Sequence, residues 1–158
     1  MTDTGLPPDR LQRWRAVAAL LLRCGLATLF IVAGVLKMRD PARFALEISN
    51  YQLLTFGTAV LAVVLPATEI VAAVGLVFLP RMWRQASALL IIAMVVMFTA
   101  AVGLAYFRGI NIDCGCFGGA EGPITGWTLM RNFGLLFAAI CVFLLENKPG
   151  VFAPRRFT

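Results

Sequence analysis

Residues 86–107 read ASALLIIAMVVMFTAAVGLAYF, and this stretch decides the fold class. It contains no charged side chain from its first residue to its last. A helix needs about 20 such residues to cross about 30 Å of hydrocarbon. Because lipid offers no partner for free backbone groups, an apolar run of this length predicts a membrane-spanning helix.

Three further apolar runs of similar length accompany it. They lie at roughly 16–36, 56–79 and 127–145. The composition agrees: 60% of the 158 residues are hydrophobic and 14% are charged, whereas soluble domains are nearer half apolar and a quarter charged. The first run is too long for a signal peptide, and no small-residue cleavage site follows it, so we expect it to be retained. The sequence predicts an all-α integral membrane four-helix bundle over residues 16–145, with tails at 1–15 and 146–158.

The charge pattern narrows the class of partner. The formal net charge is +6, but the charged residues sit at the ends of apolar runs rather than on one polar face. We therefore expect the lipid bilayer and no nucleic acid as a partner. The chain has no histidine, which removes the commonest neutral-pH acid/base group and the commonest metal ligand.

The connections between the runs differ in character. In the connector 37–55, Asp40 followed by Pro41 is typical of a helix start, with aspartate as the cap and proline at the first position. A short amphipathic helix at the membrane interface is predicted there. Its apolar face is expected to carry Phe44, Ile48, Tyr51 and Leu53. Residues 80–85 are expected to form a tight turn, and the loop 108–126, with six glycines, cannot be a regular helix.

The distribution of Lys and Arg predicts the orientation. Eight lie in the two tails and the connector after the second run: Arg10, Arg13, Arg15, Arg81, Arg84, Lys148, Arg155 and Arg156. Four lie on the opposite side: Lys37, Arg39, Arg43 and Arg108. Because positive residues favour the cytoplasm, both termini are predicted to be cytoplasmic and the loop before the fourth run extracytoplasmic.

That loop contains the sequence DCGCFGG at residues 113–119. Outside the cytoplasm, Cys114 and Cys116 can pair, since disulfides persist there. As a mechanical link the bond is weak, because closing a loop of about three residues is worth only ~1.6 kcal/mol, against ~4.7 for a hundred residues. It also requires a sharp backbone bend, which Gly115 permits. Strained, exposed disulfides are the easily reduced ones, so thiol–disulfide exchange is favoured over support.

The neighbours of the cysteine pair bear on its reactivity. Arg108 and Arg131 flank the loop and can stabilise a thiolate. Asp113 would oppose that effect or carry a proton, and Phe117 offers an apolar seat at the membrane surface. A structural disulfide remains an alternative, as does Cu(I) binding by the two thiolates, whereas a zinc site would need two more ligands that the loop lacks.

Cys24 and Cys141 lie within the first and fourth runs. Buried cysteine commonly acts as a small apolar filler. A second redox pair nearer the cytoplasmic side is the alternative, provided that the two helices are neighbours.

Two charged residues lie deep within predicted spans. Arg23 is 13 residues from the outer end of the first run, and Glu69 is 13 residues from the outer end of the second. At about 1.5 Å per residue both are ~20 Å deep, so an Arg23–Glu69 ion pair is predicted. It would either lock the helices together or form a polar site for a quinone headgroup, a proton or a substrate.

Several motifs together resemble a known family. The first run ends in AGVLKMRDPARF, the connector continues ALEISNYQLL, the second run contains PATEI, and the loop contains CGCFGG. This combination, from about Arg15 to Leu145, resembles the DoxX-like membrane proteins and specifically the methylamine-utilisation MauE branch. Proline often follows the tyrosine-x-leucine-leucine stretch in that family, whereas here Thr55 follows Leu54.

The resemblance implies a multi-pass protein of the bacterial cytoplasmic membrane that takes part in redox or maturation of proteins outside the cytoplasm. In the methylamine pathway, the family is associated with making the disulfide-rich small subunit of methylamine dehydrogenase. Carried over by position, Cys114 and Cys116 would be the redox pair, and the connector motif would be Lys37, Asp40, Pro41 and Phe44. The membership does not fix the substrate.

The leading hypothesis is a membrane thiol–disulfide oxidoreductase or electron relay with a thioredoxin-like or other disulfide-containing partner outside the cytoplasm. Quinone is a candidate electron acceptor that no residue demands. One alternative is a non-enzymatic assembly factor whose CGC loop holds a fixed disulfide. Another is a quinone-linked subunit of a larger oxidoreductase that uses Arg23 and Glu69.

Overall fold

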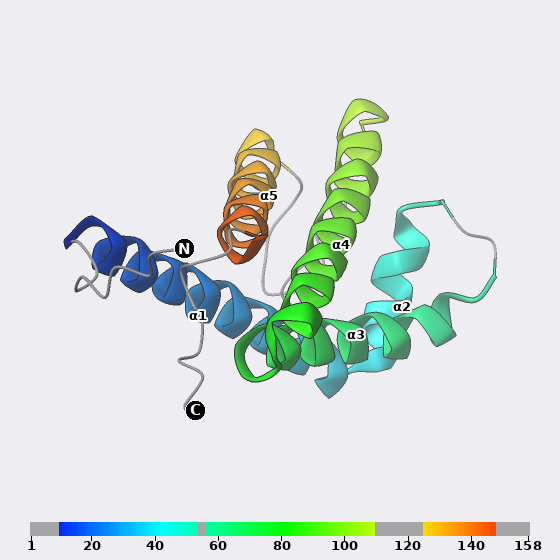
Figure 1. Cartoon of the computed structure of the whole chain (residues 1–158). Helices are drawn as coiled ribbons and strands as arrows, with labels where there is room; N and C mark the ends of the chain where they lie inside the picture. Colours follow the sequence, from blue (N-terminus) through cyan, green and yellow to red (C-terminus); the bar gives the residue numbers. More distant parts are fainter. Residues whose placement is uncertain (1–9, 54–55, 110–124, 148–158) are drawn as a thin grey trace.

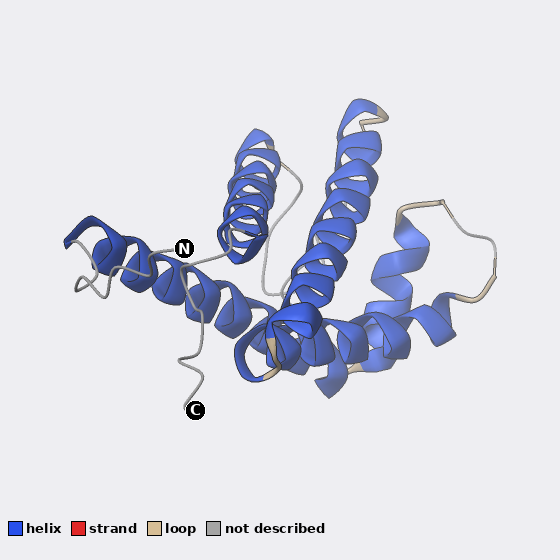
Figure 2. Cartoon of the chain, viewed as in Figure 1, coloured by secondary structure: helices blue, strands red, loops and turns tan. Residues whose placement is uncertain are grey.

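The computed structural model describes residues 10–53, 56–109 and 125–147. These residues form five helices and no strand (Figure 2). The helices are α1 (Arg10–Arg39), α2 (Pro41–Asn50), α3 (Thr58–Phe78), α4 (Arg81–Phe107) and α5 (Gly126–Asn147). The predicted all-α class, with a short helix after the first span, is confirmed.

The long helices pack as two linked pairs. α1 runs alongside α3, α4 pairs with α5, and α3 also contacts α4, while the contact between α1 and α5 is smaller (Figure 1). The short helix α2 packs mainly on α3. One core of buried side chains from α1, α3, α4 and α5 joins the two pairs.

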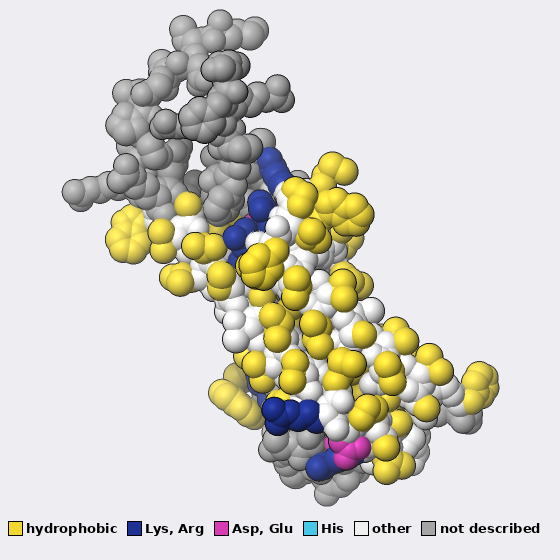
Figure 3. All heavy atoms as spheres, turned by 90° about the horizontal axis from the view of Figure 1, so that it is seen from below, with side chains coloured by type: hydrophobic (Ala, Val, Ile, Leu, Met, Phe, Trp, Pro, Cys, Tyr) yellow, Lys and Arg dark blue, Asp and Glu magenta, His cyan; other side chains and the backbone are white. Residues whose placement is uncertain are grey.

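Four of these helices are long and apolar enough to cross a membrane. The segments are Ala16–Arg39, Thr58–Phe78, Arg81–Phe107 and Gly126–Glu146. Large apolar side chains such as Leu21, Val71 and Phe137 are more than two-thirds exposed on them. In Figure 3, apolar side chains cover the middle of the visible face, and Lys and Arg lie toward the two ends. This distribution suits a body whose middle is surrounded by lipid.

Small residues form much of the packing inside the bundle. Half of the buried apolar side chains among the described residues are alanine. Gly34 on α1 lies so close to α3 that an added Cβ would be 2.8 Å from Ile70 Cγ1 and 3.0 Å from the Pro66 carbonyl oxygen. Such close approach is how membrane helices gain van der Waals contact where lipid supplies no hydrophobic driving force.

The helix α2 begins as the sequence predicts. The Asp40 carboxylate accepts a hydrogen bond from the Arg43 backbone N–H at 2.9 Å, and Pro41 occupies the first turn. Asp40 therefore satisfies one of the backbone donors that a helix start leaves free. The predicted apolar face is directed at the bundle: Phe44 is buried and Ile48 and Tyr51 are half-buried, although Leu53 is exposed.

Two predicted boundaries are wrong. The tight turn expected at 80–85 is confined to the residues around Pro80, because α4 begins at Arg81. Pro80, with extended backbone, is a suitable residue just before a helix, and nothing in 81–85 opposes helix formation. The connector expected to begin at Lys37 begins later, because α1 continues to Arg39 and buries Lys37.

Candidate functional site

The cysteine motif itself lies outside the described residues. Asp113, Cys114, Gly115, Cys116 and Phe117 all fall between 110 and 124. The structure describes the two helix ends that the motif connects, at the end of α4 and the start of α5.

The end of α4 is a defined stop. Arg108 is exposed and follows the last helical residue, with its backbone N–H donating to the Leu104 carbonyl at 3.0 Å. Gly109 then takes φ +66°, a left-handed conformation that glycine adopts without a steric cost. Arg108 thus stands where the connection leaves the bundle.

The start of α5 is capped by a pair of threonines. Thr125 N–H donates to the Thr128 hydroxyl oxygen at 3.3 Å, the arrangement of a capping box. Thr128 is buried, so this helix start is anchored in the bundle. Arg131 follows within the next turn and is half-buried. The two predicted flanking arginines therefore lie at the two ends of the connection, as their positions in sequence require.

The predicted Arg23–Glu69 ion pair is wrong. Arg23 Nη1 lies 3.2 Å from Glu146 Oε1, and Glu69 Oε1 lies 2.5 Å from Lys37 Nζ. The depths counted from the run ends do not in fact match, because Lys37, the partner of Glu69, is 14 residues from Arg23 on α1, about 21 Å by helical rise. Lys37, which the sequence seemed to place in a connector, is the cation that reaches Glu69.

Glu146, near the C-terminus of α5, contacts Arg23 of α1 and two arginines near the start of α4. Arg84 Nη2 lies 3.0 Å from Glu146 Oε2, opposite the contact with Arg23. Arg81 Nε and Gln85 Nε2 donate to the Glu146 backbone carbonyl at 2.9 and 3.3 Å. The cations lie at the C-terminus of α5, where the helix dipole also favours positive charge. This cluster joins α1, α4 and α5, and its described contacts hold these helices together.

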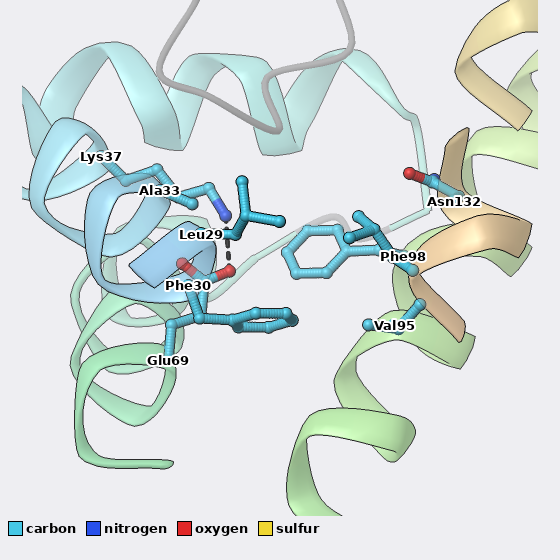
Figure 4. Close-up of a pocket in the computed structure, with 9 residues that line it drawn as sticks. Leu29, Phe30, Ala33, Lys37, Glu69, Val95, Phe98 and Asn132 are labelled. Atoms are coloured by element: carbon cyan, nitrogen blue, oxygen red, sulfur yellow. Dashed lines mark hydrogen bonds and ion pairs between the residues drawn. The ribbon is translucent and has the colours of Figure 1, made fainter. Parts of the chain in front are cut away.

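The Lys37–Glu69 pair is different, because it lies inside the bundle among aromatic rings (Figure 4). Both side chains are 2% exposed. Lys37 Nζ lies 4.6 Å from the centre of the Phe98 ring and 5.2 Å from that of Phe44, within the range of cation–π attraction. Ionisable groups at such depth are costly and commonly mark functional sites.

A small cavity adjoins this pair. Its volume is about 50 Å³. Asn132 of α5 forms part of its wall and is 4% exposed. The lining residues are Leu29, Phe30, Ala33, Lys37, Glu69, Val95, Phe98, Asn132 and Leu135. Within the described part of the chain, neither Glu69 Oε2 nor Asn132 Nδ2 has a hydrogen-bond partner. Buried polar atoms are ordinarily paired, so two residues that line this cavity carry an unsatisfied acceptor and an unsatisfied donor.

A second, larger cavity lies between α2, α3 and α4. Its volume is about 170 Å³, and Phe98 lines it as well as the first cavity. The predicted apolar face of α2 forms one wall: Phe44, Ile48, Tyr51 and Leu53. The wall is almost entirely apolar, with Glu47 as the one carboxylate among its described residues.

The two remaining cysteines are free thiols. Cys24 is exposed on α1, and Cys141 is half-buried on α5. No bond joins them, and the hypothesis of a second redox pair gains no support from this arrangement. Among residues 10–53, 56–109 and 125–147, no group of three or more Cys, Asp or Glu side chains is arranged to hold a metal ion.

Sequence reasoning did not place Asn132 or Glu146 in these sites, and it named Lys37 only in the connector motif that the family resemblance implies. Asn132 had a usable signal, since it is an amide within an apolar run. Lys37 and Glu146 lacked one, because each stands at the edge of a run, where a charge is expected to reach water.

Comparison with known proteins identifies the family of this chain. The model of the family "Methylamine utilisation protein MauE" matches residues 15–145. A curated relative, the methylamine utilization protein MauE of Paracoccus denitrificans, is 35% identical over 124 residues, which cover 77% of this chain and 66% of the relative. The chain thus spans slightly under two thirds of that relative's length. No solved structure matches the chain. With four helices able to span a bilayer, the chain is a multi-pass membrane protein that belongs to the methylamine utilisation protein MauE family.

Proposed function

We propose that the chain is a membrane thiol–disulfide redox protein that acts on proteins outside the cytoplasm through Cys114 and Cys116. The observation that carries this proposal is the CGC motif in the connection between two membrane-spanning helices of a MauE family member. Arg108 and Arg131 stand near the two ends of that connection and would favour the thiolate form.

The proposed reaction is a two-step exchange. A thiolate of one cysteine attacks a disulfide sulfur of the partner, which forms a mixed disulfide and releases one partner thiolate. The second cysteine then attacks the mixed bond, which closes the Cys114–Cys116 disulfide and releases the second partner thiol. Two electrons and two protons pass to the partner, and the reverse sequence oxidises it.

The proposed orientation has the connection from α4 to α5 outside a bacterial cytoplasmic membrane and both tails, 1–15 and 146–158, in the cytoplasm. Since each long helix crosses once, this connection shares its side with α2. The positive-inside count supports the assignment more strongly once Lys37 is recognised as buried. Eight Lys and Arg then face the cytoplasm, and three remain opposite: Arg39, Arg43 and Arg108.

The proposed client is described by its chemical class. The relative is named for methylamine utilization, and an extracytoplasmic protein with disulfides, reached directly or through a thioredoxin-like carrier, is the client class that fits a CGC pair. A place in the wider DoxX-like superfamily rests on the sequence motifs alone.

The test is the redox midpoint of Cys114 and Cys116 in membranes. Cys24 and Cys141 are first changed to serine, so that thiol alkylation across a glutathione series reports only the CGC pair. We expect a reversible midpoint within the physiological range and a trapped mixed disulfide in one of the two variants Cys114→Ser and Cys116→Ser. A bond that never reduces would instead indicate an assembly factor with a structural disulfide, and thiols that never oxidise would contradict both.

A further inference from the structure

The small cavity beside Lys37 and Glu69 has the features of a built binding site. Glu69 and Asn132 are 2% and 4% exposed, and each carries a buried polar atom that has no hydrogen-bond partner among the described residues. The two atoms differ in kind: Glu69 Oε2 accepts a hydrogen bond, and Asn132 Nδ2 donates one. Leaving such atoms unpaired is costly, so a ligand that pairs with them gains binding energy.

An apolar groove on the outside of the bundle adjoins the cavity. Leu29 and Leu135 line both spaces. The groove has a volume of about 340 Å³ and follows α1 from Leu29 back to Leu21, about 12 Å by helical rise. Gly25, which has no side chain, lies between them in the groove wall. Leu21 and Leu29 are 67% and 42% exposed, so the groove faces the lipid.

We propose that this polar cavity and apolar groove bind a membrane-dissolved quinone, with its oxygen-bearing head toward Glu69 and Asn132 and its isoprenoid chain along α1. The cavity alone has room for about four water-sized groups, enough for the carbonyl edge of a ring that extends between Leu29 and Leu135. Figure 4 shows the rings of Phe30 and Phe98 beside this space, where they offer aromatic faces to a flat head.

Charge favours a neutral head over a phosphate or carboxylate. Lys37 and Glu69 already neutralise each other across 2.5 Å. An added anion would bring an uncompensated charge into a region of low dielectric beside the Glu69 carboxylate. A quinone has no such charge: its carbonyl accepts from Asn132 Nδ2, and the hydroxyl of the quinol form donates to Glu69 Oε2.

The redox role of this ligand rests on the proposed function. Oxidation of the Cys114 and Cys116 thiols to a disulfide releases two electrons and two protons, and a quinone takes up both pairs to become a quinol. The binding site itself stands on the described residues, and its test does not require the cysteines.

The experiment uses the full chain in phosphatidylcholine nanodiscs and a photoreactive azidoquinone with a short isoprenoid tail. We expect saturable labelling of the peptides that contain Leu29 or Leu135, displaced by unlabelled quinone and not by a diacylglycerol. Labelling that does not saturate would mean that the cavity holds only water, and equal displacement by diacylglycerol would mean a general lipid site. Either result overturns the proposal.

Three variants sharpen the test. Leu29→Trp fills the junction and should abolish saturable labelling, whereas Leu20→Trp, with the same residue type and 43% exposure on α1 but outside these cavities, should leave it intact. Asn132→Leu should raise the probe concentration at half-saturation about fivefold, which is the effect of losing one neutral hydrogen bond. Its thermal stability should not fall, because it removes an unpaired buried donor. Equal labelling of Leu29→Trp and Leu20→Trp would contradict the site.

The double variant Cys114→Ser with Cys116→Ser separates the two proposals. If it still binds quinone, the site is independent of thiol chemistry. Reversible thiol–disulfide exchange in the native chain without saturable quinone labelling would contradict the quinone site alone. Saturable labelling without thiol–disulfide exchange would contradict the redox function alone.

Discussion

At the scale of single residues, the buried Lys37–Glu69 pair is costly to form. Both groups are 2% exposed, and Phe98 and Phe44 rather than water surround the ammonium group. Removing two charges from water costs several kcal/mol per ion, and their attraction offsets this only in good geometry. Loss of one partner is therefore far more damaging than loss of both.

Glu69→Gln should lower the free energy of unfolding by roughly 3–5 kcal/mol, because it leaves the Lys37 ammonium buried without its counter-charge. The measurement is denaturant unfolding in detergent, followed by helical circular dichroism.

The control is the double variant Lys37→Met with Glu69→Met, which removes both charges and should recover most of that loss. A Glu69→Gln protein as stable as the native chain would show that this pair does not hold α1 to α3.

Residue types alone could predict that charges in the spans need partners, but not which ones. Arg23 and Glu69 have matching depths by count, yet they belong to separate pairs. Helical rise gives distances within one helix, whereas partner choice between helices also depends on how far one helix is shifted along the other. Lys37 and Arg23 are 14 residues apart on α1, about 21 Å, so each reaches a different end of the bundle.

At the scale of elements, helix ends were predictable where a residue has a local reason to stop or start a helix. Asp40 and Pro41 start α2 through a cap and a first-turn proline, and the prediction is confirmed. α4 starts earlier than expected, at Arg81, because the polar residues of its first turn are compatible with a helix as well as with a turn. The close contact of α1 with α3 at Gly34 was not predictable, since it depends on the packing of two distant segments.

The contact at Gly34 gives a prediction for the α1–α3 pair. Gly34→Ala should destabilise the protein by about 1–3 kcal/mol, because its Cβ would press on Ile70 and the Pro66 backbone. Gly25→Ala is the matched control on the same helix. Nothing lies within 4 Å of its new Cβ, so stability should be unchanged or slightly higher. Thermal unfolding in detergent compares them, and equal melting temperatures would contradict the tight packing.

The cap of α2 gives a second prediction at this scale. Asp40→Ala removes the acceptor for the Arg43 N–H and should cost about 0.5–2 kcal/mol. Because α2 is short, the loss should be seen first as faster amide hydrogen exchange over Pro41–Asn50. Asp40→Asn, which keeps an acceptor oxygen, should exchange nearly as slowly as the native chain. If Asp40→Ala exchanged at the native rate, packing on α3 rather than the cap would hold the helix.

At the scale of the whole molecule, the Lys37–Glu69 pair and the helix ends that flank the cysteine motif lie toward the same end of the bundle. α1 ends two residues after Lys37, and Tyr51, which follows α2, packs against Val102 and Ala105 near the end of α4. The Glu146 cluster lies at the other end, where α1 and α5 are held by Arg23. The bundle thus has one end fixed by arginines and another in which polar atoms of Glu69 and Asn132 stay unpaired.

The proposed orientation of the bundle in the membrane can be tested by labelling cysteines in intact and lysed spheroplasts. A membrane-impermeant maleimide should react with Cys114 and Cys116 in intact spheroplasts after mild reduction, because the connection between α4 and α5 is proposed to face outward. A cysteine placed in the C-terminal tail by Thr158→Cys, with the four native cysteines changed to serine, should react only after lysis. The reverse pattern would invert the topology and move the thiols to the reducing side of the membrane, where a disulfide does not persist.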